Sequence, residues 1–368
     1  ASACVFTAYS VIAAPFQQAF QPSRTMLAMG ITLAVLATGG LGPILGSAVD
    51  RFSLRRLMLI GTFVLSTGFI LLSFTTSMNQ VLFIYFGVLS VGSVLCGPIA
   101  GSALVARWFT RRRGVAMSIA ASGAAIGGLI VPPLIQFLIE AFEWRTALQI
   151  FGVGMLCLTA PVAFFLAIDR PSDQNLYPDG DTEPPPQSTH QAHQKAASMK
   201  VFLHDRNFWL IAITLGLLLG GPMGLMAHLV QFGAEKGIDA TRAAALLSIF
   251  SAANFVGKLG SGPIADRVDF RLMLACIMVL LALTTFGFVQ ADSFALLAII
   301  IVIVGLSQGG IVPLWSLILA RVYGPDNMGR SMGLMGVLRM EERVNCFSSV
   351  TGASRDTVGG AVYFGRVE

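Results

Sequence analysis

The sequence is poor in charged residues. Lysine, arginine, aspartate and glutamate make up 12% of the 368 residues, whereas 55% are hydrophobic. Soluble globular proteins carry about twice that charged fraction, so the composition excludes an ordinary soluble domain. The net charge of +5 does not indicate a nucleic-acid partner, because basic residues in a membrane protein mainly mark the loops that face the cytoplasm.

Cysteine and histidine are also scarce, with five and four residues. The cysteines are scattered, without CxxC spacing or a nearby histidine, at Cys4, Cys96, Cys157, Cys276 and Cys346. No disulfide framework or metal site is therefore predicted. The glycine-rich runs lie inside apolar segments rather than after strands, so they do not indicate phosphate-binding loops. We expect neither an enzyme nor a protein with a cofactor.

Long apolar segments dominate what is present. A bilayer core about 30 Å thick needs roughly 20 apolar residues for each helix. Such spans fall at 1–17, 26–49, 57–75, 79–105, 114–139, 146–168, 207–231, 243–265, 272–290 and 294–319, and an eleventh begins near Gly329. Backbone polar groups in a bilayer must be satisfied within the segment, so we expect helices. The predicted fold class is an all-α polytopic membrane protein that crosses the lipid bilayer.

Basic residues gather in alternate loops. One set of loops holds most of them, including "DRFSLRR" and "RWFTRRR", and this asymmetry predicts that the set faces the cytoplasm. The same set contains the segment 169–206, which is rich in proline, acidic residues and glutamine. Because it has little to bury, we predict a mobile cytoplasmic connection.

The chain repeats itself. "GSAVDR" (Gly46 to Arg51) recurs as "GPIADR" (Gly262 to Arg267), and "LVARWF" recurs as "ILARVY". A third match aligns "RGVAMSI" with "MGRSMGL", so all three matches share an offset of 214 to 216 residues. Both copies lie on the same loop side, which predicts parallel repeats related by an axis along the membrane normal. We expect helical halves at 1–168 and 207–338, joined by 169–206.

The repeat also predicts what the two ends contain. Residue 1 aligns inside the seventh span, so we expect an incomplete first helix. The segment 339–368 is too polar to span a membrane and matches nothing earlier in the chain. We interpret it as an aberrant non-membrane tail that replaces most of helix eleven and all of helix twelve.

Two six-helix halves, a long central loop and "GSAVDRFSLRR" resemble the major facilitator superfamily, over about residues 1–338. The family pattern G-x-x-x-D-R-x-G, followed by two basic residues, is matched except that Ser53 takes the place of the second glycine. The matching residues are Gly46, Asp50, Arg51, Arg55 and Arg56, and in the second copy Gly262, Asp266 and Arg267. The resemblance implies that these residues govern conformation, with Asp50 facing the N-terminal end of the eleventh helix, where the helix dipole favours an anion.

A narrower resemblance points to a group within that family. "RWFTRRRGVAMSIAASGAAIGG" is similar to the signature between helices four and five of monocarboxylate transporters, and "RPSDQNLYPDG" and "FLHDRNFWLIA" are similar to bacterial members. The group carries an acidic residue and an arginine four apart in helix eight, where this chain has Asn254 and Lys258. The resemblance implies a monomeric carrier of a small organic anion in the bacterial inner membrane. Proton coupling stays open, because the carboxylate is not kept.

Lys258 is the residue that best fits such a substrate. It lies eight residues before Asp266, hence about 12 Å from the cytoplasmic end, and an intramembrane charge costs at least about 2.5 kcal/mol. We interpret its ammonium group as a donor to a carboxylate in a central cavity; the alternative is a lysine that snorkels to the cytoplasm. Asn254, one turn above on the same face, either shares the ligand or joins two helices.

Two further residues are candidates for the site. His228 follows "GGPMG" in the outer part of the seventh span, where it suits a gate or a proton step or is a satisfied interfacial histidine. Gln308 in the tenth span is a weaker candidate. The alternative functions are a proton-driven exporter of hydrophobic drugs, a membrane sensor, and an inactive truncated carrier. The exporter run G-P-x-x-G-G is absent from "SGAAIGGLIVPP", which favours the anion carrier.

Overall fold

The computed structural model describes residues 2–181, 199–219, 240–290 and 293–337, and within these ranges the chain is helical and has no strand. Seven of the described helical segments are long and apolar enough to cross a membrane. They are Thr25–Arg51, Leu54–Ser73, Met78–Trp108, Arg113–Ala141, Trp144–Leu166, Phe270–Phe288 and Phe294–Val322. Each overlaps a span that the apolar runs predict.

The first half consists of helices that follow one another through short turns. They are α1 (Ser2–Phe20), α2 (Arg24–Arg51), α3 (Leu54–Ser73), α4 (Met78–Ile84), the π-helix η1 (Tyr85–Leu89), α5 (Ser90–Leu95), α6 (Pro98–Trp108), α7 (Arg113–Ala141) and α8 (Trp144–Leu166). The span expected at 79–105 is thus several helices. A new helix starts at Pro98 because proline lacks a backbone donor and is suited to the first helical position.

The second half is described in part. Its elements are α9 (Met199–His204), a helix at 206–219, α11 (Ala240–Arg267), α12 (Phe270–Val289), α13 (Phe294–Val322), the 3₁₀ turn η4 (Pro325–Asn327) and a helix at 328–337. The expected start of helix eleven is therefore present. The predicted tail at 339–368 lies outside the described residues.

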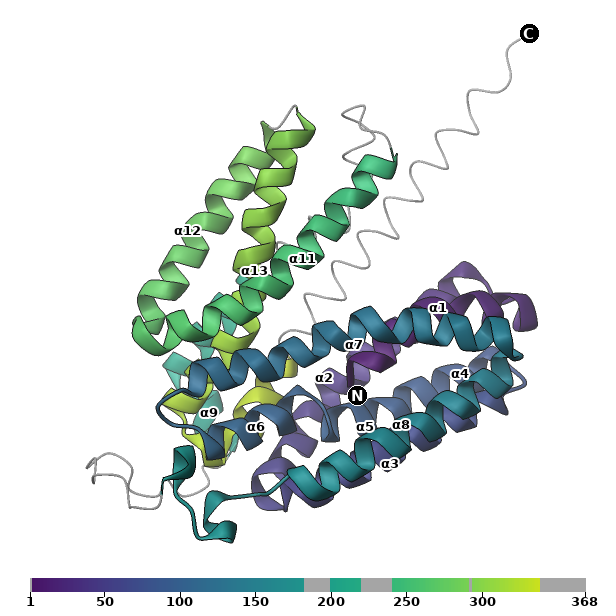
Figure 1. The fold of residues 1–368 in the computed structure, drawn as a ribbon, viewed down its shortest axis with the longest axis horizontal. Coiled ribbons are helices and arrows are strands. Elements are labelled where there is room, and N and C mark those ends of the chain that lie inside the picture. The colour runs from purple at the N-terminus through teal and green to yellow at the C-terminus, as the bar shows by residue number, and fades with distance from the viewer. Residues whose placement is uncertain (1, 182–198, 220–239, 291–292, 338–368) are drawn as a thin grey trace.

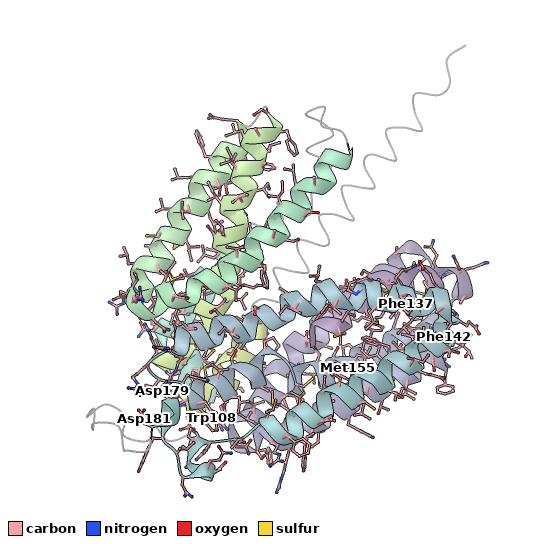
Figure 2. The ribbon with its side chains drawn as sticks, in the orientation of Figure 1. Trp108, Phe137, Phe142, Met155, Asp179 and Asp181 are labelled. Atoms are coloured by element: carbon pink, nitrogen blue, oxygen red, sulfur yellow. The ribbon has the colours of Figure 1, made fainter. Side chains whose placement is uncertain are left out.

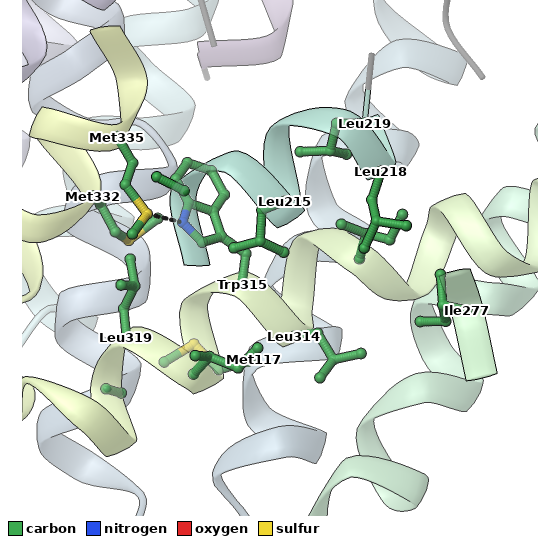
Figure 3. Close-up of a cluster of buried hydrophobic side chains, with 14 of the residues drawn as sticks. Met117, Leu215, Leu218, Leu219, Ile277, Leu314, Trp315, Leu319, Met332 and Met335 are labelled. Carbon is green, nitrogen blue, oxygen red and sulfur yellow. Dashed lines mark hydrogen bonds between the residues drawn. The ribbon is translucent and has the colours of Figure 1, made fainter. Parts of the chain in front are cut away.

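The two halves meet at one end of the molecule. Figure 1 shows α11, α12 and α13 at a steep angle to the first-half helices, with α6, α7, α9, α11 and α13 coming together near the linker. A hydrophobic cluster fills this junction and includes Met117 of α7 and Trp315 of α13. The Trp315 indole Nε1 donates to the Met335 sulfur at 3.2 Å, as drawn in Figure 3.

Large apolar side chains cover the outer faces of the helices. Phe63, Phe83, Leu129 and Leu283 are each at least 60% exposed, and Figure 2 shows such side chains along the whole length of the bundle. A soluble monomer rarely exposes so much contiguous apolar surface. The pattern fits helices that face lipid.

The linker departs from its prediction. Two short 3₁₀ turns, η2 (Pro171–Gln174) and η3 (Pro178–Gly180), follow α8. The Trp108 indole donates to the Ile168 carbonyl at 2.7 Å, and the Arg55 backbone N–H donates to Asp169 at 2.8 Å. The expectation of a mobile connection is wrong for 169–181, because its acidic side chains reach backbone N–H groups of the first half. Residues 182–198 lie outside the described part of the chain.

Candidate functional site

We define the basic end as the end of the bundle where α2, α6, α11 and α13 finish and where α7 and the helix 328–337 begin. At this end Asp50 occupies the last turn of α2, and its side chain is fully buried. The Asp50 carboxylate accepts hydrogen bonds from the Gly329 N–H at 2.7 Å and the Arg330 N–H at 2.9 Å. The first turn of a helix presents unpaired N–H groups and the positive end of the dipole. Asp50 therefore binds the start of the helix 328–337, and the Arg330 guanidinium lies 3.9 Å from the same carboxylate.

Asp266 makes the equivalent contact in the other direction. It lies in the last turn of α11, and its carboxylate accepts from the Gly114 N–H at 2.7 Å and the Val115 N–H at 3.1 Å. These positions align with Asp50, Gly329 and Arg330 in the sequence repeat. We refer to the two sets of bonds as the paired contacts. Each of them joins one half of the molecule to the other.

Two arginines add a second symmetrical pair. Arg107 donates to the Val49 carbonyl at 3.3 Å, and Arg321 donates to the Ala265 carbonyl at 3.1 Å. A cation near the last carbonyls of a helix satisfies acceptors that lack helical donors. Sequence reasoning gave these arginines no role, although both lie in the repeated "LVARWF" and "ILARVY" segments.

One contact joins equivalent positions of the two copies. The Ser102 and Ser316 hydroxyl oxygens lie 3.1 Å apart, and the two serines are separated by the repeat offset of 214 residues. Because the symmetry operation exchanges the two partners, this bond marks the pseudo-twofold axis. The structure thus has the parallel repeat that the sequence predicts.

Glycines let the halves approach at the level of the backbone. A Cβ placed on Gly46 would collide with the Gly329 carbonyl oxygen, and one on Gly42 would lie 2.7 Å from the Gly333 carbonyl oxygen. In the second pair of helices, Gly262 packs against the Gly114 carbonyl and the Ser118 hydroxyl. The halves can close at the basic end only because these positions lack side chains.

Lys258 breaks this symmetry. It takes the place that Gly42 holds in the first copy, one helical turn from Gly262 and on the same face, so it lies on the side of α11 that approaches α7. The residue is half-buried, and its backbone nitrogen would lie 2.8 Å from a Cβ on Gly309 of α13. Among the described helices, Lys258 is the charged residue farthest from the ends of its helix. The repeat thus has a lysine in the second half where the first half has glycine.

The structure places two of the other three predicted site residues, and each has different neighbours. Asn254 is half-buried and presents its backbone oxygen to Gly309. Gln308 is buried and donates from Nε2 to the Leu219 carbonyl at 3.2 Å, while its Oε1 has no hydrogen-bond partner among the described residues. His228 lies outside the described residues.

The basic residues of the loop motif do not share one role. The Arg51 and Arg267 side chains are exposed. The Arg55 guanidinium lies over the Phe164 ring, 4.3 Å from its centre. The carboxylates and glycines of the two motif copies therefore make the contacts between the halves, whereas these arginines lie outside them.

The far end of the linker is fastened to the second half. The Tyr323 hydroxyl donates to Asp205 at 2.7 Å, and Asp205 also accepts from the Asn207 N–H at the start of the helix 206–219. Burial, together with the hydrogen bond to Asp205, raises the pKa of Tyr323. The phenol therefore stays a donor throughout the physiological pH range.

Residues 1–340 match the Major Facilitator Superfamily profile. The chain is 28% identical over 342 residues to monocarboxylate transporter 12 of Xenopus laevis, covering 89% of this chain and 74% of that protein. It is 22% identical over 339 residues to the MFS-type transporter YcxA of Bacillus subtilis, covering 87% and 77%. The solved Escherichia coli fucose:proton symporter superposes with a TM-score of 0.70 at 15% identity, covering 97% of this chain and 90% of that one.

Proposed function

The chain belongs to the Major Facilitator Superfamily, and on that premise we propose that it is a secondary transporter of a small organic anion, a monocarboxylate, working by alternating access. The observation that carries the substrate class is Lys258, a cation on the face of α11 that approaches α7. The apolar run at 243–265 predicts a membrane span around this residue. A charge in such a span is costly, and a functional partner is the usual reason for its presence. The relatives named monocarboxylate transporter 12 support the same class.

We also propose where the protein lies and which way it faces. A bacterial inner membrane is supported by the bacterial relative, and a cytoplasmic basic end is supported by the excess of arginine there. With that orientation, the paired contacts close the cytoplasmic side, and the described conformation is open or occluded toward the outside. Gly46, Asp50, Gly262 and Asp266 form the gate, while Arg51, Arg55 and Arg267 surround it.

The transport cycle follows from these placements. An anion enters from the outer side and meets the Lys258 ammonium, with Asn254 as a further polar contact. Pairing with the anion offsets the charge, which lowers the cost of excluding water when the outer side closes. The halves then rock about the site near the midplane, and the paired contacts separate to release the anion. A proton coupling step through His228 is part of this proposal.

Uptake into proteoliposomes tests the substrate class. We expect saturable uptake of labelled lactate or pyruvate that unlabelled monocarboxylates inhibit and that a sugar or a cationic drug does not. Imposing a proton gradient reports coupling in the same assay. Transport of a cationic drug with no anion uptake would contradict the proposal and favour the drug exporter, and no transport of either class would favour an inactive carrier.

A further inference from the structure

An acidic residue of the linker is held in an unusual conformation at the basic end. Asp179 has a left-handed backbone, with φ of +66°, and Gly180 follows with φ of +79°. Its side chain is only 13% exposed although it belongs to a surface loop. Figure 2 shows Asp179 and Asp181 beside Trp108, at the end of α6. A non-glycine residue with positive φ is uncommon and is tolerated best by aspartate and asparagine.

The conformation aims the Asp179 carboxylate at two backbone donors. It accepts from the Thr110 N–H at 3.1 Å and the Arg111 N–H at 3.0 Å. Three residues further along, Gly114 and Val115 donate to Asp266. The turn between α6 and α7 is therefore held by a carboxylate from the linker, and the first turn of α7 by a carboxylate from the second half.

In the second copy of the repeat, residues of the turn itself hold the segment that precedes the helix 328–337. There the segment before the helix 328–337 is the 3₁₀ turn Pro325–Asn327, with a proline where the first copy has Thr110. The Asn327 side chain donates to the Tyr323 carbonyl at 3.0 Å. Proline fixes φ before the helix begins. The first copy has the counterpart of the Asn327 bond, because the Arg113 side chain donates to the Phe109 carbonyl at 2.7 Å. The turn at 109–112 has no proline, however, and is not a 3₁₀ helix, and Asp179 holds its Thr110 and Arg111 N–H groups from outside.

We propose that Asp179 is a positioning residue for the gate. By binding Thr110 and Arg111 it fixes the turn from which α7 starts, and so holds the Gly114 and Val115 N–H groups where Asp266 reaches them. The inference deepens the proposed transport cycle, because it assigns control of cytoplasmic closure to the start of the central loop. A salt bridge of 3.8 Å between Arg170 and Asp326 also links residues 169–181 of the linker to the second half. Both side chains are exposed, and such a pair contributes little to stability.

Spin labels at Arg56 and Arg271 measure the effect directly. These exposed residues lie in the first turns of α3 and α12. Each is replaced by cysteine to carry a label, in a chain whose native cysteines are replaced by alanine. Asp179→Asn is expected to raise the ratio of long to short distances about tenfold, the equivalent of about 1.4 kcal/mol. Asp181→Asn is the matched control, because the Asp181 carboxylate is 45% exposed and its contacts among the described residues are with the Arg111 side chain; we expect a change of less than about twofold.

A second variant keeps the test decisive if Asp179→Asn does not fold. Gly180→Ala keeps every carboxylate and meets open space, but alanine is strained at φ of +79°, so it displaces the turn and should shift the distances in the same direction. Unchanged distances in both Asp179→Asn and Gly180→Ala, with helical content retained, would overturn the inference. The measurement needs no substrate, so a failure of anion uptake in the unaltered chain would refute the proposed function and leave this result standing.

Discussion

Replacing both Asp50 and Asp266 by asparagine is expected to lower the initial rate of anion uptake by about two orders of magnitude. Each carboxylate accepts two backbone hydrogen bonds at the start of a helix. Hydrogen bonds to a charged group contribute about 1.5–3 kcal/mol, and about 1.4 kcal/mol corresponds to tenfold in an equilibrium. An asparagine side chain has one amide oxygen to accept from one of the two backbone N–H groups, and it places its NH₂ group against the other. The basic end then no longer stays closed while the outer side is open.

The two single variants separate the contacts. Asp50→Asn should be the more severe, because it also leaves the buried Arg330 guanidinium beside a neutral group. Asp269→Asn is the matched control: this carboxylate lies three residues after Asp266, in the turn between α11 and α12, but accepts locally from the Arg271 N–H, and asparagine also caps helices well. Uptake by the double variant within about threefold of the unaltered chain would remove the paired contacts from the transport cycle.

A single added methyl group at Gly46 should have a comparable effect for a different reason. The Gly46 position faces the Gly329 carbonyl oxygen with no room for a Cβ, so Gly46→Ala must push α2 away from the helix 328–337. Overpacking of this kind costs about 1–3 kcal/mol. It also lengthens the bonds from Asp50 one turn away. We expect uptake to fall by about 10- to 100-fold.

Gly40→Ala provides the matched control in the same helix. A Cβ at Gly40 meets no atom within 4 Å, and alanine favours a helix over glycine by about 1 kcal/mol. This variant should fold and transport like the unaltered chain. Equal losses of uptake in Gly40→Ala and Gly46→Ala would mean that glycine serves helix flexibility rather than the approach of the two halves.

The apolar runs and the internal repeat predicted most of the fold. Hydrophobic segments of about 20 residues leave little choice but helices in a bilayer. The alignment of Gly46 with Gly262, and of Gly114 with Gly329, placed the residues that meet at the basic end. The contact of Asp50 with the helix 328–337 was expected only through the family resemblance. Its counterpart at Asp266 follows once the repeat is applied to both partners.

The linker was harder to predict, for a physical reason. Its composition of proline, acidic residues and glutamine is that of a segment with nothing to bury. Asp179 is held by its contact with two backbone N–H groups, and no side-chain pattern records backbone donors. The positive φ at Asp179 and Gly180 leaves only the weak signal of an Asp-Gly pair, which reads as an ordinary turn.

The site itself was predicted as a list of residues rather than as an arrangement. Lys258 stands out in the sequence because charge is rare inside the spans. Its place on the same face of α11 as Gly262 follows from their spacing of four residues. The packing of Gly262 against Ser118 brings that face toward α7, which the repeat suggests but does not fix. Gln308 was named for its polarity, and its bond to the Leu219 carbonyl ties it to the second half instead of to the interface between the halves.

Equilibrium binding of labelled lactate to the purified chain, with Lys258→Gln beside it, tests the central claim most directly. If the ammonium group of Lys258 receives the carboxylate, the glutamine variant should bind at least about tenfold more weakly, since a charge-assisted bond becomes a neutral one. Equal dissociation constants for the two proteins, both folded, would contradict an anion site at Lys258.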